Sequence, residues 1–179
     1  ILQMRRASRQ VILPLWGVHL GIPEASIALI VGVAGAVDLS LFYTSGQVMD
    51  RYGRRWVAVP VLTGLGLAHL VLPLAATEWG YIAVAILLSI ANGMGSGIVM
   101  TLGSDLASRS APGRMPAFLG SWRVFSDTGS AIGPLGISAL TAAFGLPAAA
   151  LAMGGCGLVG AVLMYRYIPR LLRPAGGGR

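Results

Sequence analysis

Five apolar segments, each long enough to cross a lipid bilayer, constrain this chain more than any other feature. They cover residues 25–48, 56–76, 79–102, 115–143 and 146–168. A helix needs about 20 apolar residues to span the hydrocarbon core, so each segment can form one transmembrane helix. A shorter apolar run at 11–22 precedes them. The sequence therefore predicts an all-α membrane protein, a bundle of six transmembrane helices whose first helix is incomplete.

The charge content excludes the common soluble classes of protein. Only 11% of the 179 residues are charged, whereas soluble domains carry about 25%. The single cysteine excludes a disulfide framework and a cysteine-based metal site. The two histidines, His19 and His69, stand far apart without a metal-binding pattern, so we expect no metal. A net charge of +7 is typical of nucleic-acid binding in soluble proteins, but these arginines flank apolar segments and indicate membrane topology instead.

Arginines gather in alternate connections between the apolar segments. The connection at 49–55 holds three, the one at 103–114 holds two, and the stretch 166–179 holds four. The other connections hold only Glu24, only Glu78, or no charge. Because cytoplasmic loops carry the excess of basic residues, we expect the arginine-bearing connections and the C-terminus to lie in the cytoplasm of a multi-pass protein of the cell membrane.

The first apolar run is too short for a complete span. About a dozen helical residues cover about 18 Å, against a hydrocarbon core of about 30 Å. We therefore expect the chain to begin inside a helix and to be a fragment. The predicted organisation is one six-helix unit at 1–169, truncated at its N-terminus, and a basic cytoplasmic tail at 170–179.

Small residues recur at every fourth position in two of the predicted helices, which favours close helix packing in lipid. The two stripes are Ala28, Gly32, Ala36 and Ser40, and Ala85, Ser89, Gly93, Gly97 and Thr101. Prolines inside apolar segments are tolerated in a bilayer. We expect Pro60, Pro73 and Pro134 to kink helices rather than end them.

The connection between the second and third predicted helices reads Gly-Gln-Val-Met-Asp-Arg-Tyr-Gly-Arg-Arg-Trp. A glycine at its start lets the helix end approach a neighbour, charges stand at the water boundary, and a second glycine permits the positive φ of a tight turn. The residues concerned are Gly46, Asp50, Arg51, Gly53, Arg54 and Arg55.

This stretch resembles the loop signature of the major facilitator superfamily, Gly-x-x-x-Asp-Arg-x-Gly-Arg-Arg, at every fixed position. In that family the signature joins the second and third helices of each six-helix half, as it does here. The resemblance implies half of a twelve-helix secondary transporter, not an enzyme, with no cofactor. It also implies that the loop arginines pair with an acid at the end of the fourth helix, so that Asp105, facing Arg54 or Arg55, would lock the inner side.

A second resemblance lies in the fifth helix, where Gly120, Gly129, Gly133 and Pro134 are similar to the glycine-rich signature of drug/proton antiporters. This implies proton-coupled efflux, although Ile137 and Ser138 stand where that signature closes on two glycines. In the fourth helix, Ser89 replaces the usual arginine before Gly93. The missing arginine and the basic tail favour the C-terminal half.

Charged residues inside the predicted helices are candidates for a site, because a charge at mid-bilayer needs a partner or a water-filled cavity. Asp38 is predicted either to contact substrate or carry a proton, or to form a structural ion pair with an arginine of the first or fifth predicted helix. Arg123 and Asp127 are four residues apart and form either an internal ion pair or part of a gate. Arg9, with Arg5 and Arg6, either lines a cavity and attracts an anionic substrate or anchors the chain at the cytoplasmic surface.

The function predicted from these patterns is secondary active transport of a small organic solute by alternating access, with proton-coupled efflux. The expected partners are the lipid bilayer, the substrate, protons and the other six-helix half, in the same polypeptide or in a homodimer; nucleic acid is not expected. The alternative is a non-transporting membrane scaffold, or an orphan half that only assembles with a partner. An intramembrane serine protease is disfavoured, since Met94 replaces the first glycine of a Gly-x-Ser-Gly pattern and no histidine follows.

Overall fold

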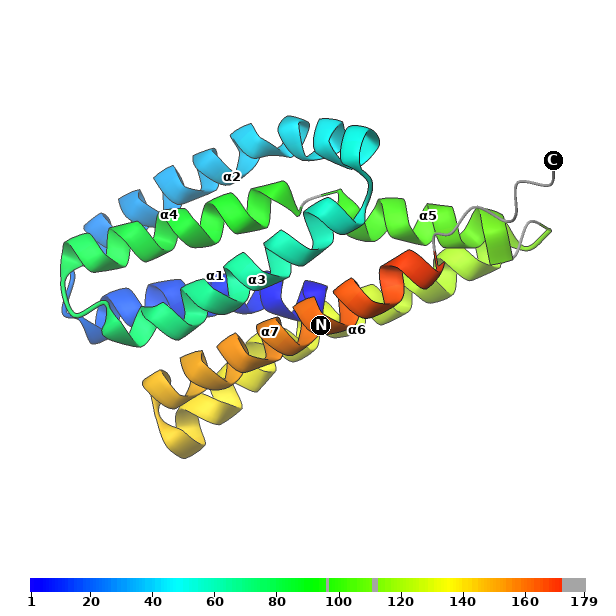
Figure 1. Ribbon diagram of the computed structural model, residues 1–179. Coiled ribbons are helices and arrows are strands. Elements are labelled where there is room, and N and C mark those ends of the chain that lie inside the picture. The colour runs from blue at the N-terminus through cyan, green and yellow to red at the C-terminus, as the bar shows by residue number, and fades with distance from the viewer. Residues whose placement is uncertain (96, 111–112, 172–179) are drawn as a thin grey trace.

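The computed structural model describes residues 1–95, 97–110 and 113–171, and the regular structure in this part is entirely helical (Figure 1). The elements are α1 (Leu2–His19), α2 (Glu24–Tyr52), α3 (Arg55–Val71), the short 3₁₀ turn η1 (Leu72–Leu74), α4 (Glu78–Met94), α5 (Ile98–Ser110), α6 (Met115–Phe144) and α7 (Leu146–Leu171). The predicted all-α fold is confirmed. The predicted tail at 170–179 lies outside the described residues from 172 onward.

Four helical segments of the described chain are long and apolar enough to cross a membrane. They are Glu24–Tyr52, Arg55–Leu74, Glu78–Ser110 and Leu146–Tyr167. The arginine-bearing α1 and the long α6 fall outside this set, so the number of crossings stays a prediction. These four segments alone require a multi-pass arrangement.

Glycines with positive φ end three of the helices. Gly21 has φ 71°, Gly53 has φ 91° and Gly145 has φ 85°. Only glycine adopts this region without steric cost. The prediction that Gly53 makes a tight turn after the second long helix is confirmed.

Two predictions about the helices are wrong, one on the length of a helix and one on the effect of a proline. The segment predicted as one helix at 79–102 is divided, since α4 ends at Met94 and α5 begins at Ile98. Gly95 and Gly97 flank this break, and glycine is a weak helix former. Pro73 lies in η1 after the end of α3 rather than at a kink within it, because proline has no N–H to continue the helical hydrogen bonds.

Side chains from neighbouring helices satisfy the carbonyl groups at the division between α4 and α5. Ser45 Oγ of α2 donates to the carbonyl oxygen of Met94. Arg6 Nη1 of α1 lies 3.5 Å from the carbonyl oxygen of Gly95. The break is therefore held by two other helices, as irregular backbone in a membrane protein requires.

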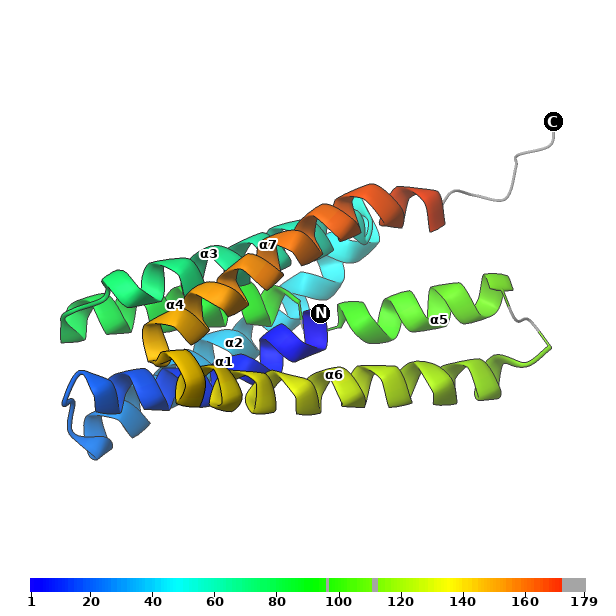
Figure 2. The same ribbon diagram turned by 90° about the horizontal axis from the view of Figure 1, so that it is seen from below.

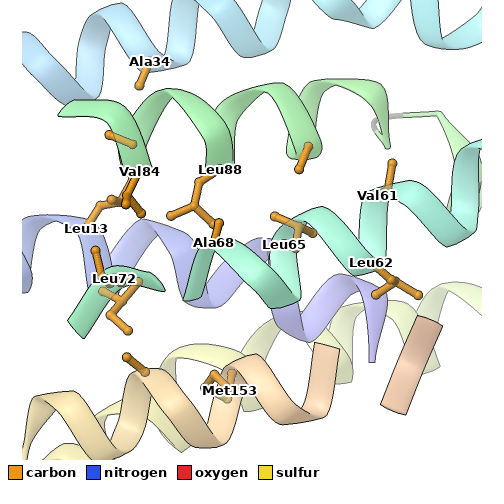
Figure 3. Close-up of a cluster of buried hydrophobic side chains, with 14 of the residues drawn as sticks. Leu13, Ala34, Val61, Leu62, Leu65, Ala68, Leu72, Val84, Leu88 and Met153 are labelled. Carbon is orange, nitrogen blue, oxygen red and sulfur yellow. The ribbon is translucent and has the colours of Figure 1, made fainter. Parts of the chain in front are cut away.

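The helices enclose an apolar core to which every helix from α1 to α7 and the turn η1 contribute, and Figure 3 shows a part of it. Leu62, Leu65 and Leu88 are fully buried in it. The most extensive contact between two helices joins α3 to α7, and their backbones approach closely, since a Cβ on Gly157 would lie 2.8 Å from Gly66 Cα. In both views α1 begins at mid-length of the bundle, beside α7 and α6 (Figures 1 and 2).

The two small-residue stripes behave differently. In α4, Ser89 and Gly93 are buried, and a Cβ on Gly93 would lie 2.5 Å from the carbonyl oxygen of Asp38. In α2, the whole stripe of Ala28, Gly32, Ala36 and Ser40 is exposed. The expectation that the α2 stripe packs within this chain is therefore wrong, because α2 meets α4 with its Asp38 face instead.

Candidate functional site

An ion pair between α1 and α2 lies inside the bundle. Arg9 Nη2 is 3.0 Å from Asp38 Oδ2, and their side chains are only 13% and 17% exposed. Arg9 Nη1 also donates to Ser89 Oγ of α4 at 2.8 Å. Asp38 thus has an arginine partner from the first helix, one of the alternatives left open by the sequence, and Arg9 ties three helices together.

A second arginine joins the same carboxylate through an amide. Asn92 Nδ2 of α4 donates to Asp38 Oδ2 at 2.6 Å, and Arg6 Nε donates to Asn92 Oδ1 at 2.9 Å. The resulting chain of Arg6, Asn92, Asp38, Arg9 and Ser89 is called the interior network below. It contains two guanidinium groups and one carboxylate.

Asn92 was not among the site residues predicted from the sequence, although a signal was present. An amide side chain in the middle of an apolar helix needs a hydrogen-bond partner, and Asn92 lies three residues after Ser89, on the same face of α4. Gly93 then lets α2 approach α4 closely enough for Asn92 to reach Asp38.

Arg5 turns away from this network. Its side chain is fully buried, and Nη2 donates to the carbonyl oxygen of Leu65 in α3 at 2.8 Å. His69 Nδ1 lies 2.8 Å from the same carbonyl oxygen. All three α1 arginines therefore contact the middle of the bundle, near Leu65 and Ser89, rather than the turns that carry the other arginines.

The loop signature places one arginine against α5 and the next against α7. Arg54 Nε lies 2.7 Å from Asp105 Oδ2, and the two side chains are 28% and 27% exposed. Arg55 instead stacks on Tyr165, with Cζ 3.9 Å from the ring centroid. Of the two partners considered for Asp105, the structure places Arg54 there.

The other signature residues make fewer contacts. Asp50 is exposed, and Arg51 lies over the ring of its neighbour Tyr52 at 5.6 Å. A Cβ on Gly46 would have nothing within 4 Å. The expected close approach of a neighbouring helix at Gly46 is therefore absent from the described residues.

Arg123 and Asp127 of α6 form an ion pair on an exposed face. Arg123 Nε is 3.5 Å from Asp127 Oδ2, with side chains 64% and 65% exposed. The expected ion pair between these two residues is present, but it lies on an exposed face of α6 instead of an internal one, because α6 packs on α1 through its glycine face.

In the glycine-rich signature, which lies in α6, Gly133 makes the closest contact with α1. A Cβ on Gly133 would clash with the backbone of Met4, whereas one on Gly129 would make an ordinary contact of 3.6 Å with Gln3 Cβ. Gly120 has open space around it, and Pro134 lies inside α6. The signature thus works at one position as a helix-packing device.

Two hollows border the interior network. One, of about 410 Å³, lies between α1, α5 and α6 and includes Gln3, Arg6 and Asp127. The other, of about 300 Å³, reaches Asn92 and again includes Gln3 and Arg6. Among the described residues no cluster of His, Cys, Asp and Glu is arranged to hold a metal ion.

Residues 4–178 match the model of a protein family described as Major Facilitator Superfamily. No curated protein and no solved structure matches the chain. The match covers nearly the whole sequence, including α2 to α7 and all but the first two residues of α1.

Proposed function

Since the chain belongs to the major facilitator superfamily of membrane transporters, we propose that it moves a small organic solute across the cell membrane by alternating access, with protons as the driving ion and efflux as the direction. The family transports solutes rather than catalysing a reaction. This multi-pass chain would form the C-terminal six-helix half, with its arginine-bearing connections in the cytoplasm.

The observation that carries the proposal is the pairing of Asp38 with Arg9 inside the bundle. A charge at mid-bilayer costs about 2.5–3.5 kcal/mol even on the insertion scale that gives the lowest values, so an ionisable pair there calls for a functional reason. Protonation of Asp38 would remove the charge that holds Arg9 and Asn92. A proton taken up on one side and released on the other would thereby change how α1, α2 and α4 are held together.

The pair of Arg54 and Asp105 supports a conformational switch at the loop end. Alternating access requires bonds that exist in one state and break in the other. This pair joins the turn after α2 to α5 across a region where α5 packs mainly on α6. We propose that it locks the inner side closed in the outward-open state, while Arg55 on Tyr165 anchors the turn to α7 in both states.

A second six-helix half would cover the exposed sides of α2 and α6. The small-residue stripe of α2 and the charged pair of α6 are both exposed in this chain. Neither is suited to face lipid, because small residues favour helix contact and charges favour a partner or water. The partner half would come from the same polypeptide or from a second copy, with the substrate bound between the halves.

The proposal of efflux rests on the resemblance of α6, the fifth predicted helix, to the glycine-rich signature of drug/proton antiporters. Gly133, which belongs to that resemblance, brings α6 against α1 next to the interior network. The close packing at Gly133 therefore helps to position α1, the helix that supplies Arg6 and Arg9.

The test is transport by the complete natural protein in proteoliposomes, with and without a pH gradient, across a panel of small organic acids, amines and neutral solutes. We expect accumulation of at least one solute that depends on the gradient, and loss of that dependence in Asp38→Asn. Glu24→Gln, at the exposed first residue of α2, is the matched control and should behave as wild type. Gradient dependence that survives in Asp38→Asn would refute the role of Asp38. Absence of transport for every solute would favour the scaffold alternative.

A further inference from the structure

We propose that the hollow of about 410 Å³ between α1, α5 and α6 binds an organic anion, with its acidic group at Arg6. The inference rests on the proposed transport function and names the substrate class. Both hollows share Arg6, which therefore stands at the junction between this cleft and the interior network.

Polar side chains from two helices line this region in helical register. On α1, Gln3, Arg6 and Gln10 follow one another at intervals of three and four residues, which places them on one face. On α6, Ser126 and Ser130 are four residues apart and border the first and second hollow. Amide and hydroxyl groups beside a guanidinium suit a ligand that accepts several hydrogen bonds.

Among the described charged side chains of the cleft and the interior network, arginines outnumber carboxylates by one. Arg6 and Arg9 share a single carboxylate, Asp38, through the interior network. Arg123 and Asp127 compensate each other on the opposite wall. Within the described lining, a bound anion with one negative charge would bring the site to neutrality, and a guanidinium binds a carboxylate more strongly than a neutral acceptor.

The remaining wall of the cleft is apolar and fits the body of such a ligand. Val99, Met100 and Leu119 contribute to it together with the ring of Trp122. Trp122 Nε1 donates to the carbonyl oxygen of Val99 at 2.9 Å, which fixes the ring. The cleft therefore suits a small anion with an apolar or aromatic part, and an inside-negative membrane potential drives an anion outward.

The test measures binding by the purified natural protein of three compounds with one body: 3-phenylpropionate, 3-phenylpropionamide and 3-phenylpropylamine. Isothermal titration should show the acid binding at least tenfold more tightly than the amide or the amine. Arg6→Gln should weaken acid binding at least tenfold, Arg6→Lys should retain part of it, and Arg166→Gln on the exposed outer part of α7 should leave it unchanged.

A charge added to the cleft provides a second readout if Arg6→Gln fails to fold. Gln3→Glu should weaken binding of the acid and strengthen binding of the amine. Preference of the wild-type protein for the amine, binding of none of the three compounds, or acid affinity indifferent to both Arg6→Gln and Gln3→Glu would overturn the inference. Transport that still depends on the pH gradient and Asp38 would then leave the proposed function standing.

Discussion

Two arginine–aspartate pairs link helices of this protein, and they differ in what surrounds them. The pair of Arg9 and Asp38 lies at mid-bundle and is bonded further to Ser89 and Asn92. The pair of Arg54 and Asp105 lies at the loop end, is about twice as exposed, and has no other side-chain hydrogen bond within the described residues.

The difference indicates which pair can open during transport. If Arg54 and Asp105 separate, water replaces the lost partner at little cost, as for exposed ion pairs generally. If Arg9 and Asp38 separate while both are charged, Arg9 is left without a carboxylate in a low dielectric, and Asp38 keeps only its indirect link to Arg6 through Asn92. We infer that the loop-end pair opens by ordinary helix motion, whereas the interior pair changes through protonation.

The strongest test of this comparison is removal of Arg9, the cation that contacts Asp38 directly. Arg9→Gln should lower the free energy of unfolding by about 3–5 kcal/mol, the range for a buried pair that loses one partner. Asp38→Asn added to Arg9→Gln should restore part of this loss, because the carboxylate that has lost its direct partner is gone, while Arg6 then loses its link to that carboxylate. The measurement is unfolding in detergent micelles with increasing denaturant. A loss below about 1 kcal/mol in the single variant would show that water already reaches the interior pair.

At the loop end the expected effect is conformational rather than on stability. Asp105→Asn should cost no more than about 1 kcal/mol of folding free energy, yet it should shift the equilibrium towards the inward-open state about fivefold. The readout is labelling of a cysteine at Ser104, exposed on α5, by an impermeant maleimide after Cys156→Ser. The exchange Arg54→Asp with Asp105→Arg should return the labelling rate towards wild type. Labelling from both sides that does not change in Asp105→Asn would contradict the switch.

The two pairs also differ in how far the sequence predicts them. The proximity of Arg54 and Asp105 can be predicted from topology, because alternate connections meet at one end of a helical bundle. The loop signature stands in one of these connections. The choice of Arg54 over Arg55 required the structure, in which Tyr165 occupies Arg55. The sequence also predicts the long helices, because one apolar segment is enough to predict each of them from hydropathy.

The interior network depends on helix rotation, which hydropathy does not encode when a helix is apolar all round. The sequence favoured the stripe containing Gly32 and Ala36 as the packed side of α2, whereas the structure places the face of Asp38 against α4. The close fit of Gly93 against the Asp38 backbone decides between them. The division after Met94 depends in the same way on contacts from other helices, with Ser45 and Arg6 holding its carbonyl groups.

The smallest expected effect concerns the exposed pair of Arg123 and Asp127. This third pair has no hydrogen bond to the interior network within the described residues. Arg123→Gln should change the free energy of unfolding of the natural protein by no more than about 0.5 kcal/mol, the range for an exposed pair four residues apart on a helix. Arg123→Gln with Asp127→Asn should be equally mild. The reason is that both side chains border the hollow of about 410 Å³, where water replaces a missing partner. Unfolding in the same micelles provides the measurement. A loss above about 1.5 kcal/mol in Arg123→Gln alone would place the pair in a dry interface with the second half, and α6 would then resemble the interior of the bundle rather than its water-filled side.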